Sequence, residues 1–529
     1  MKQSRHLIFL FSIVVAFLLT LSSCREKATD ISETDFIYVE DSCFMLHGEP
    51  FFPIMLNYIV SFQNTQDDGF LVAPSINYDS VGYVEAWGKE AVQKQLDGHF
   101  QLIREMGFNT LRICFDRTDQ DDQGYFYRAD NRKFRIGNVS DEQAILRGLR
   151  DFMEIAQKHG LRVMLLIKCP LHSPAIELFT TRIMNTFRDC PTLFAYDFMN
   201  EPLYFDPVMK RKKKEARKMA EHWKKLMTRH APYQLFTIGF AEPIEVFEWD
   251  PSMLPVDFVE FHTYHPLRVA SEIYWYSKYV GKPWMVGETA LPADNDSISY
   301  EEQASFLRET YQLVRDAGGC GYGWWEYQEC PDGNFEAQYT GLLNHQGRTT
   351  TADGKHTIYG TLKPTGRCLP QLADYKQKPM ERPVNYYNML GYKNIRITGT
   401  IIDQRTKKPI EGAVIRGWNE CWDVGMNTFS DENGQFTLYS NDECVHFEIS
   451  APGKSKTKFD KIITYSCETG EKFDVQTLPN RKLEYHQISH HSFLDRSDTT
   501  IVPVLQFRAS EFNQYKWTGD MGTVMLHDE

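Results

Sequence analysis

The sequence predicts a (β/α)8 barrel followed by an all-β sandwich. Between about residues 50 and 375, short apolar runs alternate with longer amphipathic stretches; after Pro379, short alternating strands and polar turns replace the helices. Eight strands that alternate with helices are typical of a closed parallel barrel, whereas helix-free runs of short strands are typical of a sandwich. An open doubly wound sheet is the alternative for the first part, but no glycine-rich phosphate loop follows the first strand.

Each expected barrel strand is a short apolar run ended by polar residues or glycine. The eight strands are Phe51–Asn57, Thr110–Phe115, Arg162–Lys168, Phe194–Met199, Gln234–Phe240, Val256–Phe261, Pro283–Gly287 and Gly319–Trp325. Between them, apolar residues recur at helical spacing. The expected helices are Val92–Met106, Glu142–His159, Leu178–Asp189, Val208–His230 and Tyr300–Ala317.

The segment after the barrel carries three motifs of a known module. Its expected strands are Arg396–Ile402, Ala413–Trp418, Val445–Ser450 and a hairpin over Thr428–Leu438 that turns at Asn433-Gly434. The stretches Gly399-Thr-Ile-Ile-Asp403, Pro409-Ile-Glu-Gly-Ala413 and Ser430-Asp-Glu-Asn-Gly-Gln-Phe436 resemble the carboxypeptidase-regulatory-like family of small sandwiches. That family usually serves as an accessory module, so the resemblance implies no chemistry. We therefore expect a barrel over residues 36–380 and a sandwich over 392–482, with 483–529 either completing the sandwich or extending beyond it.

The charge and cysteine pattern narrow the class of partner. The formal net charge is −13 with both signs interspersed, which argues against a nucleic-acid partner. The basic run Lys210–Lys214 shares its helix with Glu215 and Glu221, so we interpret it as a solvated outer face. The cysteines form no CxxC pairs, and no metal-ligand spacing or cofactor motif is present. We expect neither a metal nor a cofactor.

The first residues resemble an export signal. Lys2 and Arg5 precede the apolar run Leu7–Leu21, which is shorter than a membrane-spanning helix needs. The ending Leu21-Ser-Ser-Cys24 resembles a bacterial lipobox, which implies cleavage after residue 23 and lipid modification of Cys24. We therefore expect residues 1–24 to form a lipoprotein signal, and the mature protein to be exported and anchored to a bacterial membrane, at the outer membrane or cell surface. An ordinary signal peptide with an incidental cysteine is the alternative.

Polar side chains stand where several of the predicted strands end. Because the carboxyl ends of barrel strands meet at one mouth, these residues are able to act together. Strand four ends in Asn200-Glu201 and strand seven in Glu288, which places two carboxylates across the mouth. Cleavage of a glycosidic bond needs such a pair, one protonated and one ionised, and retaining enzymes hold them about 5–5.5 Å apart.

The order of these motifs resembles a known enzyme family. Asn-Glu-Pro after strand four, His262-Thr-Tyr264 after strand six, Gly-Glu after strand seven and tryptophan on strand eight look like a retaining glycoside hydrolase of clan A, closest to family 5. The resemblance implies a β-linked carbohydrate substrate, with Glu201 as general acid/base and Glu288 as nucleophile. It assigns the supporting roles as follows: Asn200 holds the sugar 2-hydroxyl, Arg112 and Tyr264 contact the nucleophile, His262 lines the cleft, and Trp325 stacks on the sugar. It also places His172 in the cleft, although the residues around His172 depart from the family's motif.

Purely structural roles for these residues remain open. Glu201 and Glu288 could be solvated strand ends, Arg112 a barrel salt bridge, and one of Trp324 and Trp325 a core residue. Two other functions are compatible with the same motifs: a surface glycan-binding protein that no longer cuts, and a transglycosidase that passes the sugar to another sugar instead of water. Neither the linkage nor the sugar can be predicted from the loops.

Overall fold

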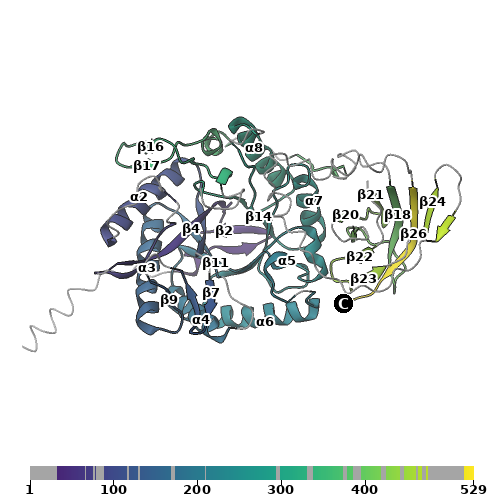
Figure 1. The fold of residues 1–529 in the computed structure, drawn as a ribbon, viewed down its shortest axis with the longest axis horizontal. Helices are drawn as coiled ribbons and strands as arrows, with labels where there is room; N and C mark the ends of the chain where they lie inside the picture. Colours follow the sequence, from purple (N-terminus) through teal and green to yellow (C-terminus); the bar gives the residue numbers. More distant parts are fainter. Residues whose placement is uncertain are drawn as a thin grey trace, which may run out of the picture.

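The computed structural model contains a closed barrel of eight parallel strands, as the sequence predicts (Figure 1). It describes residues 32–529 apart from 66, 76–77, 79–87, 116–117, 129–131, 168–172, 209, 294–297, 331–337, 373–377, 385–394, 419–424, 441–445, 460–462, 467–471 and 475–516. The barrel strands are β4 (Ile54–Thr65), β6 (Thr110–Phe115), β10 (Arg162–Leu166), β11 (Leu193–Asn200), β12 (Leu235–Phe240), β13 (Val259–His262), β14 (Trp284–Glu288) and β15 (Tyr322–Trp324). Pairing of β15 with β4 closes the ring, so the doubly wound alternative is wrong.

Helices cover the outside of the barrel, and three of them, α3, α4 and α8, begin with a capping side chain. The helices are α2 (Lys89–Glu105), α3 (Val139–Lys158), α4 (Pro174–Phe187), α5 (Pro202–Phe205), α6 (Lys213–His230), α7 (Val269–Tyr279) and α8 (Tyr300–Asp316). Asn138 accepts the first free amides of α3, and Ser299 with Glu302 forms a capping box on α8. The sequence analysis missed α7. Among the described residues, no helix is long and apolar enough to cross a membrane.

The barrel region also contains short β segments and turns of 3-10 helix. The strand β4 continues beyond the predicted end and pairs antiparallel with β5 (Gly69–Pro74). The remaining small strands are β1 (Tyr38–Glu40), β2 (Cys43–Leu46), β3 (Glu49–Pro50), β7 (Thr118–Asp121), β8 (Gly124–Tyr127), β9 (Phe134–Arg135), β16 (Arg348–Thr350) and β17 (Thr357–Tyr359). The 3-10 turns are η1 (Glu33–Asp35), η2 (Pro243–Phe247), η3 (Pro364–Arg367) and η4 (Leu369–Gln371).

The C-terminal region is a sandwich of two sheets with its own apolar core, beside the α7 side of the barrel (Figure 1). Its strands are β18 (Ile395–Asp403), β19 (Val414–Trp418), β20 (Gly425–Phe429), β21 (Gln435–Ser440), β22 (His446–Ser450), β23 (Thr457–Phe459), β24 (Ile463–Ser466), β25 (Lys472–Asp474) and β26 (Trp517–Leu526). One sheet has the order β21-β18-β26-β24-β25 and the other β20-β19-β22-β23. The last strand, β26, lies between β18 and β24, so the sandwich extends past residue 482.

The predicted hairpin over Thr428–Leu438 is wrong. Its two strands, β20 and β21, belong to different sheets, and the turn between them carries the chain across the sandwich. The Asp431 carboxylate accepts hydrogen bonds from the amides of Asn433 and Gln435, and Gly434 has a φ of 71°. The turn therefore lies where the sequence analysis placed it, but Asn433 lacks the positive φ of a two-residue Asn-Gly hairpin turn, and the two strands pair in different sheets.

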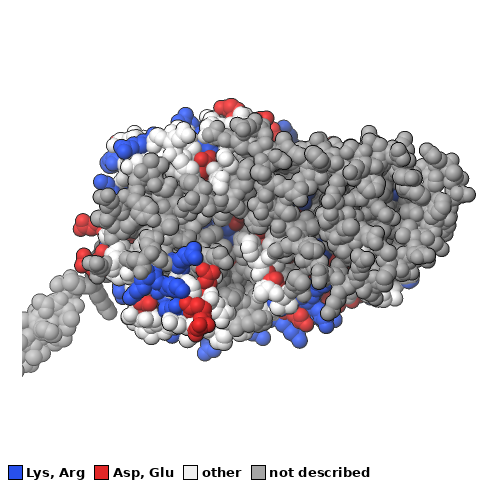
Figure 2. All heavy atoms as spheres, in the orientation of Figure 1, with Lys and Arg blue, Asp and Glu red and all other residues white. Residues whose placement is uncertain are grey.

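The sandwich packs on three segments of the barrel: η2 with the residues after it, α7 and the start of α6. The indole of Trp275 in α7 donates to the carbonyl of Gly412, and the Lys213 ammonium bonds the carbonyls of Ala451 and Lys454. The Arg416 guanidinium lies over the Phe247 ring at 4.9 Å. On the face drawn in Figure 2, the described basic and acidic side chains lie beside one another, as the mixed charge pattern of the sequence predicts.

Candidate active site

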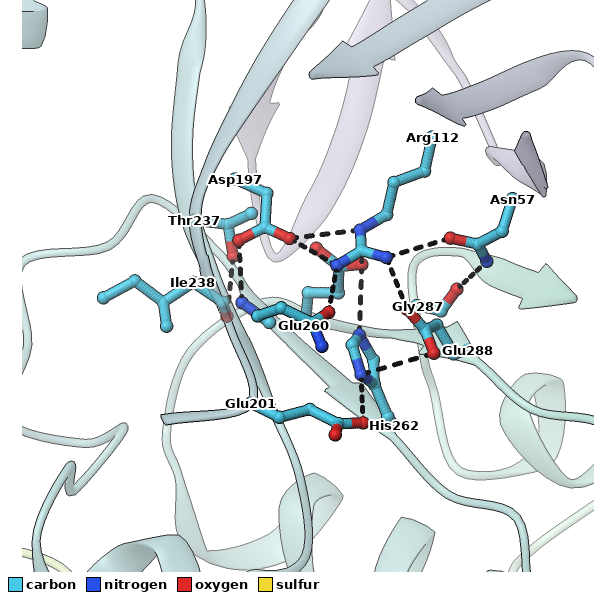
Figure 3. A network of polar contacts seen from close by, with 12 residues as sticks. Asn57, Arg112, Asp197, Glu201, Thr237, Ile238, Glu260, His262, Gly287 and Glu288 are labelled. Atoms are coloured by element: carbon cyan, nitrogen blue, oxygen red, sulfur yellow. Dashed lines mark hydrogen bonds and ion pairs between the residues drawn. The ribbon is translucent and has the colours of Figure 1, made fainter. Parts of the chain in front are cut away.

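The structure brings the polar residues of several strand ends to one mouth of the barrel (Figure 3). Glu201 directly follows β11, Glu288 ends β14, and His262 ends β13. His262 and Glu288 are paired across the two neighbouring strands, while Arg112 reaches the same group from within β6. The sequence-predicted residues Arg112, Asn200, Glu201, His262, Tyr264 and Glu288 are all connected in this network.

Glu201 has an unusual backbone conformation. Its φ of 40° and ψ of 71° lie in the left-handed region, which a residue other than glycine adopts at a cost of about 1–3 kcal/mol. Its amide donates to the carbonyl of Gly239 at 2.6 Å, and Pro202 begins the short helix α5 immediately afterwards. The Asn-Glu-Pro sequence thus turns the chain sharply where the strand ends. The carboxylate keeps 13% of its side-chain surface exposed at the mouth.

Glu288 is held by two donors. The Arg112 guanidinium donates to Oε1, and the Tyr264 hydroxyl donates to Oε2. Both contacts are those that the family resemblance implies for the second carboxylate. Together they fix the orientation of the carboxylate and spread its negative charge.

The two carboxylates face each other at short range. One ligand atom from each of Glu201, His262 and Glu288 lies within 4.8 Å of the other two, so an oxygen of Glu201 and an oxygen of Glu288 are no farther apart than that. Inverting glycosidases place their carboxyl groups about 6.5–9.5 Å apart to leave room for water, whereas retaining ones bring them to about 5–5.5 Å. The separation fits the retaining geometry.

Behind the mouth, Arg112 is enclosed by carboxylates. It bonds Asp197 at 2.7 Å and forms an ion pair with Glu260 at 3.2 Å, in addition to Glu288. The side chains of Arg112, Asp197 and Glu260 are 0% exposed. Burial lowers the pKa of the guanidinium, but Glu260 and Asp197 outweigh this effect and hold that pKa well above its usual range. Burial raises the pKa of Asp197 to about 7.

His262 links the two candidate catalytic carboxylates. Its Nδ1 lies 2.8 Å from Glu201 Oε1 and 3.6 Å from Glu288 Oε2, and its Nε2 lies 3.7 Å from Glu260 Oε1. Burial lowers the pKa of His262, but Glu288, Glu201 and Glu260 together raise it to about 10. The ring is therefore an imidazolium at neutral pH and donates from Nδ1 to Glu201.

These protonation states also bear on metal binding. Glu201, His262 and Glu288 offer three ligand atoms close enough to surround an ion. A metal, however, needs the neutral imidazole, and the Arg112 cation already occupies one oxygen of Glu288. The group therefore suits proton transfer better than metal binding.

Four buried polar residues of this region were missed by the sequence analysis: Asn57, Asp197, Glu260 and Glu326. The Asn57 amide donates to the carbonyls of Gly287 and Trp324 and accepts from Arg112, which ties four strands together. Glu326 accepts from the Tyr78 hydroxyl at 2.8 Å, and burial, with Glu288 nearby, raises its pKa to about 8. The signal was available: Asp197 and Glu260 are charged residues inside mainly apolar strands, and Glu260 lies two residues before His262, on the same face.

The remaining predicted site residues have mixed outcomes. Trp324 is fully buried, and its indole donates to the carbonyl of Thr340, so it is the core residue of the pair. Trp325 is half-buried at the edge of the same core, where a stacking role remains a prediction. His172 and Cys24 lie outside the described residues.

Comparison with known proteins gives likenesses of fold alone. No family model matches the sequence, and no curated protein matches it either. Among solved structures, an endo-1,4-β-mannanase from Rhizomucor miehei matches with a TM-score of 0.40 and 13% identity over 58% of this chain and 97% of its own. An exo-β-1,4-mannosidase from an Opitutaceae bacterium matches with a TM-score of 0.43 and 15% identity, over 65% of this chain and 62% of its own. GH5_18 from Streptomyces cattleya, in complex with GlcNAc, matches with a TM-score of 0.43 and 13% identity, over 67% of this chain and 85% of its own. We infer the function below from the residues of the site and not from these likenesses.

Proposed function

We propose that the protein is a retaining β-glycosidase of the family 5 type. The observation that carries the proposal is the short separation of Glu201 and Glu288, whose nearest oxygens lie within 4.8 Å across the mouth of the barrel. A solvated pair of strand ends would not require the left-handed backbone of Glu201 or the two donors on Glu288.

In the first step, an oxygen of Glu288 bonds to the anomeric carbon of the sugar. The bond from that carbon to the leaving oxygen breaks, and the leaving oxygen takes a proton from Glu201. The transferred proton lies on the other oxygen of Glu201, because the His262 imidazolium donates to Oε1 at 2.8 Å and stabilises the carboxylate that the transfer leaves. Arg112 and Tyr264 hold Glu288 in line.

In the second step, Glu201 accepts a proton from an incoming water. The water oxygen bonds to the anomeric carbon, and the bond from that carbon to Glu288 breaks. Two displacements at one carbon return its original configuration. The product should therefore be the β-anomer when first released.

A kinetic comparison of two variants tests the proposal. Glu288→Ala should abolish turnover of aryl β-glycosides, since no covalent intermediate can form. Glu201→Ala should slow substrates with poor leaving groups far more than dinitrophenyl glycosides, and azide should restore turnover as a β-glycosyl azide. Proton NMR of the first product provides the stereochemical readout.

A matched control separates chemistry from general loss of charge. Glu221→Ala removes a carboxylate that is 42% exposed on helix α6, and it should keep full activity. The proposal would be contradicted if the Glu288→Ala variant turned over substrate as fast as the wild type, or if the α-anomer were released first. Binding of a β-linked polysaccharide without release of reducing ends would favour the non-cutting alternative.

We also propose that Cys24 carries a lipid anchor. The support is the lipobox-like ending of the N-terminal apolar run. Cells fed an alkyne fatty acid should label the wild-type protein but not Cys24→Ser, and the variant should leave the membrane fraction. Equal labelling of both would contradict the anchor.

A further inference from the structure

The short helix α5 begins without a cap from its own N-cap residue. That residue is Glu201, and an N-cap side chain commonly accepts one of the first free amides of its helix. The Glu201 carboxylate makes no such bond to α5; it is hydrogen-bonded to His262 at the mouth of the barrel instead. Since the proposed mechanism keeps this carboxylate at the mouth, the helix needs an acceptor from another part of the chain.

The amide that this arrangement leaves to be satisfied is that of Leu203. The residue before it, Pro202, has no N–H, and the amides of the two residues after it donate to the Glu201 carbonyl at 2.9 and 3.0 Å. Leu203 donates to Glu245 Oε1 at 2.9 Å. Glu245 lies in η2, 42 residues farther along the chain, and it is 0% exposed. A buried side chain of η2 thus caps α5.

The same oxygen of Glu245 also reaches the end of the neighbouring strand. It accepts the amide of Ala241, which directly follows β12, at 3.2 Å. The carbonyl of Gly239, within β12, accepts the amide of Glu201 at 2.6 Å. The chain after β11 is therefore tied to the end of β12 through the amides of both Glu201 and Leu203. These bonds hold the left-handed backbone of Glu201, which costs free energy to maintain.

Glu245 supplies this acceptor without adding a negative charge beside Glu201. Burial raises the pKa of Glu245 well above its usual range, Glu248 and Glu201 raise it further, and the two backbone amides only partly offset these effects. The neutral carboxyl is therefore favoured, and its carbonyl oxygen accepts both amides. A glutamine side chain has a carbonyl oxygen at the same distance from the backbone, so it is a conservative replacement.

We propose that Glu245 is a positioning residue for the acid/base: it caps α5 in place of Glu201 and so holds the Glu201 carboxylate at the mouth. The inference rests on the proposed function, from which the acid/base role of Glu201 is taken.

Loss of the cap should act on one carboxylate of the pair and not on the other. Without Glu245 the Leu203 amide loses its acceptor, and the turn at Glu201 is free to relax toward a commoner backbone conformation. Displacement of a reacting group by about 1 Å can cost on the order of 10²-fold in rate. Glu288 lies on β14 and is oriented by Arg112 and Tyr264, so its place does not depend on this cap.

The leaving-group dependence of the rate distinguishes positioning of the acid/base from general loss of structure. Departure of phenolate needs a proton from Glu201, whereas 2,4-dinitrophenolate departs without one. The value of kcat/KM is measured for both types of aryl β-glycoside of glucose, mannose and their β-1,4-linked disaccharides. This parameter covers the steps up to the covalent intermediate on Glu288. A smaller folded fraction lowers both values equally and leaves their ratio unchanged.

Glu245→Leu should lower kcat/KM about tenfold or more for the phenyl glycoside, and less than about threefold for the dinitrophenyl glycoside. Glu245→Asp, whose carboxyl group is one methylene shorter, should change the ratio in the same direction by a smaller factor, and it serves if the leucine variant does not fold. Glu245→Gln should keep the ratio within about twofold of wild type, because the acceptor oxygen is retained.

A matched control and a second readout complete the test. Phe236→Leu alters a fully buried side chain of β12 that packs on Phe198; it should lower the melting temperature and leave the ratio unchanged. Hydrogen exchange of the peptide that spans α5 does not depend on activity. Exchange there should be faster in Glu245→Leu than in wild type, and close to wild type in Glu245→Gln.

The inference would be overturned if Glu245→Leu and Glu245→Asp slowed both leaving groups equally, or if neither changed the ratio. Unchanged exchange in α5 would show that Glu245 does not cap the helix. If the wild type turned over none of these glycosides, the proposed function would fail and the positioning role with it, so that failure is distinct from failure of the cap.

Discussion

Replacing Arg112 with methionine removes the one guanidinium that is shared by three carboxylates behind the mouth of the barrel. Methionine fills much of the same volume but leaves Asp197 and Glu260 buried without the cation that lies 2.7 and 3.2 Å away in the native protein. At an effective dielectric constant of about 20, one pair of unit charges about 3 Å apart interacts by roughly 5 kcal/mol. Removal of one partner of a buried pair typically costs about 3–5 kcal/mol of unfolding free energy, and we expect that loss for Arg112→Met at pH 7.5.

The loss should shrink as the pH falls. Burial raises the pKa of Asp197 in the folded state to about 7 although Arg112 lowers it, so loss of Arg112 should raise that pKa further above its value in the unfolded chain. Groups shifted in this direction contribute full stability only when protonated, and they destabilise the fold as the pH rises. The difference between wild type and variant in urea unfolding should therefore be smaller at pH 5 than at pH 7.5.

Two further variants control this experiment. Arg217→Met breaks an exposed pair with Glu221 on helix α6 and should change the unfolding free energy by no more than about 0.5 kcal/mol. Adding Glu260→Gln to Arg112→Met should recover at least about 1 kcal/mol, because one of the unpaired charges is removed. A loss below about 1 kcal/mol for Arg112→Met, or a loss that is the same at both pH values, would refute this electrostatic account.

Three other substitutions follow from the same geometry. Glu326→Gln should flatten the pH dependence of stability. With a Glu326 pKa of about 8, the wild type should lose up to about 1.4 kcal/mol of unfolding free energy per pH unit as the pH rises from about 4.5 to 8. A difference in unfolding free energy between wild type and variant that is the same at pH 5 and pH 8 would contradict this. Trp325→Ala should raise KM with little loss of stability, whereas Trp324→Ala should cost about 3–5 kcal/mol of unfolding free energy; equal stability losses would contradict the assignment. Gly287→Ala should cost about 1–3 kcal/mol, because its Cβ would lie 2.0 Å from Glu260 Oε1; a thermal melt unchanged from wild type would show that Glu260 can move aside.

The barrel was predictable because each unit of it is a local pattern. Apolar runs followed by amphipathic stretches mark strands and helices within a few residues of their observed bounds, as for Thr110–Phe115, which matches β6. Closure of the ring follows from the number of units. The strand ends then place Glu201 and Glu288 at one mouth without any knowledge of side-chain contacts.

The inner layer of the site depends on pairings that no local pattern specifies. Glu260 and Asp197 act through Arg112, which is more than eighty residues away from each in the chain. The sequence shows only that each is a charge in an apolar strand, and identifying the partner requires the register of the barrel. The same limit explains why the hairpin prediction was wrong. The position of the turn at Asn433-Gly434 could be predicted locally, but the sheet that each flanking strand joins could not.

The contacts between the sandwich and the barrel have a practical consequence for anyone who shortens this protein. Trp275 is 0% exposed because Gly412 and its neighbours cover α7, and Lys213 is neutralised by Asp250 within a seam completed by Ala451 and Lys454. Expression of the barrel alone would uncover the Trp275 indole and take the carbonyls of Ala451 and Lys454 away from the Lys213 ammonium. The C-terminal region is therefore better treated as a structural part of the folded protein than as a detachable appendage, and shortened variants should retain it.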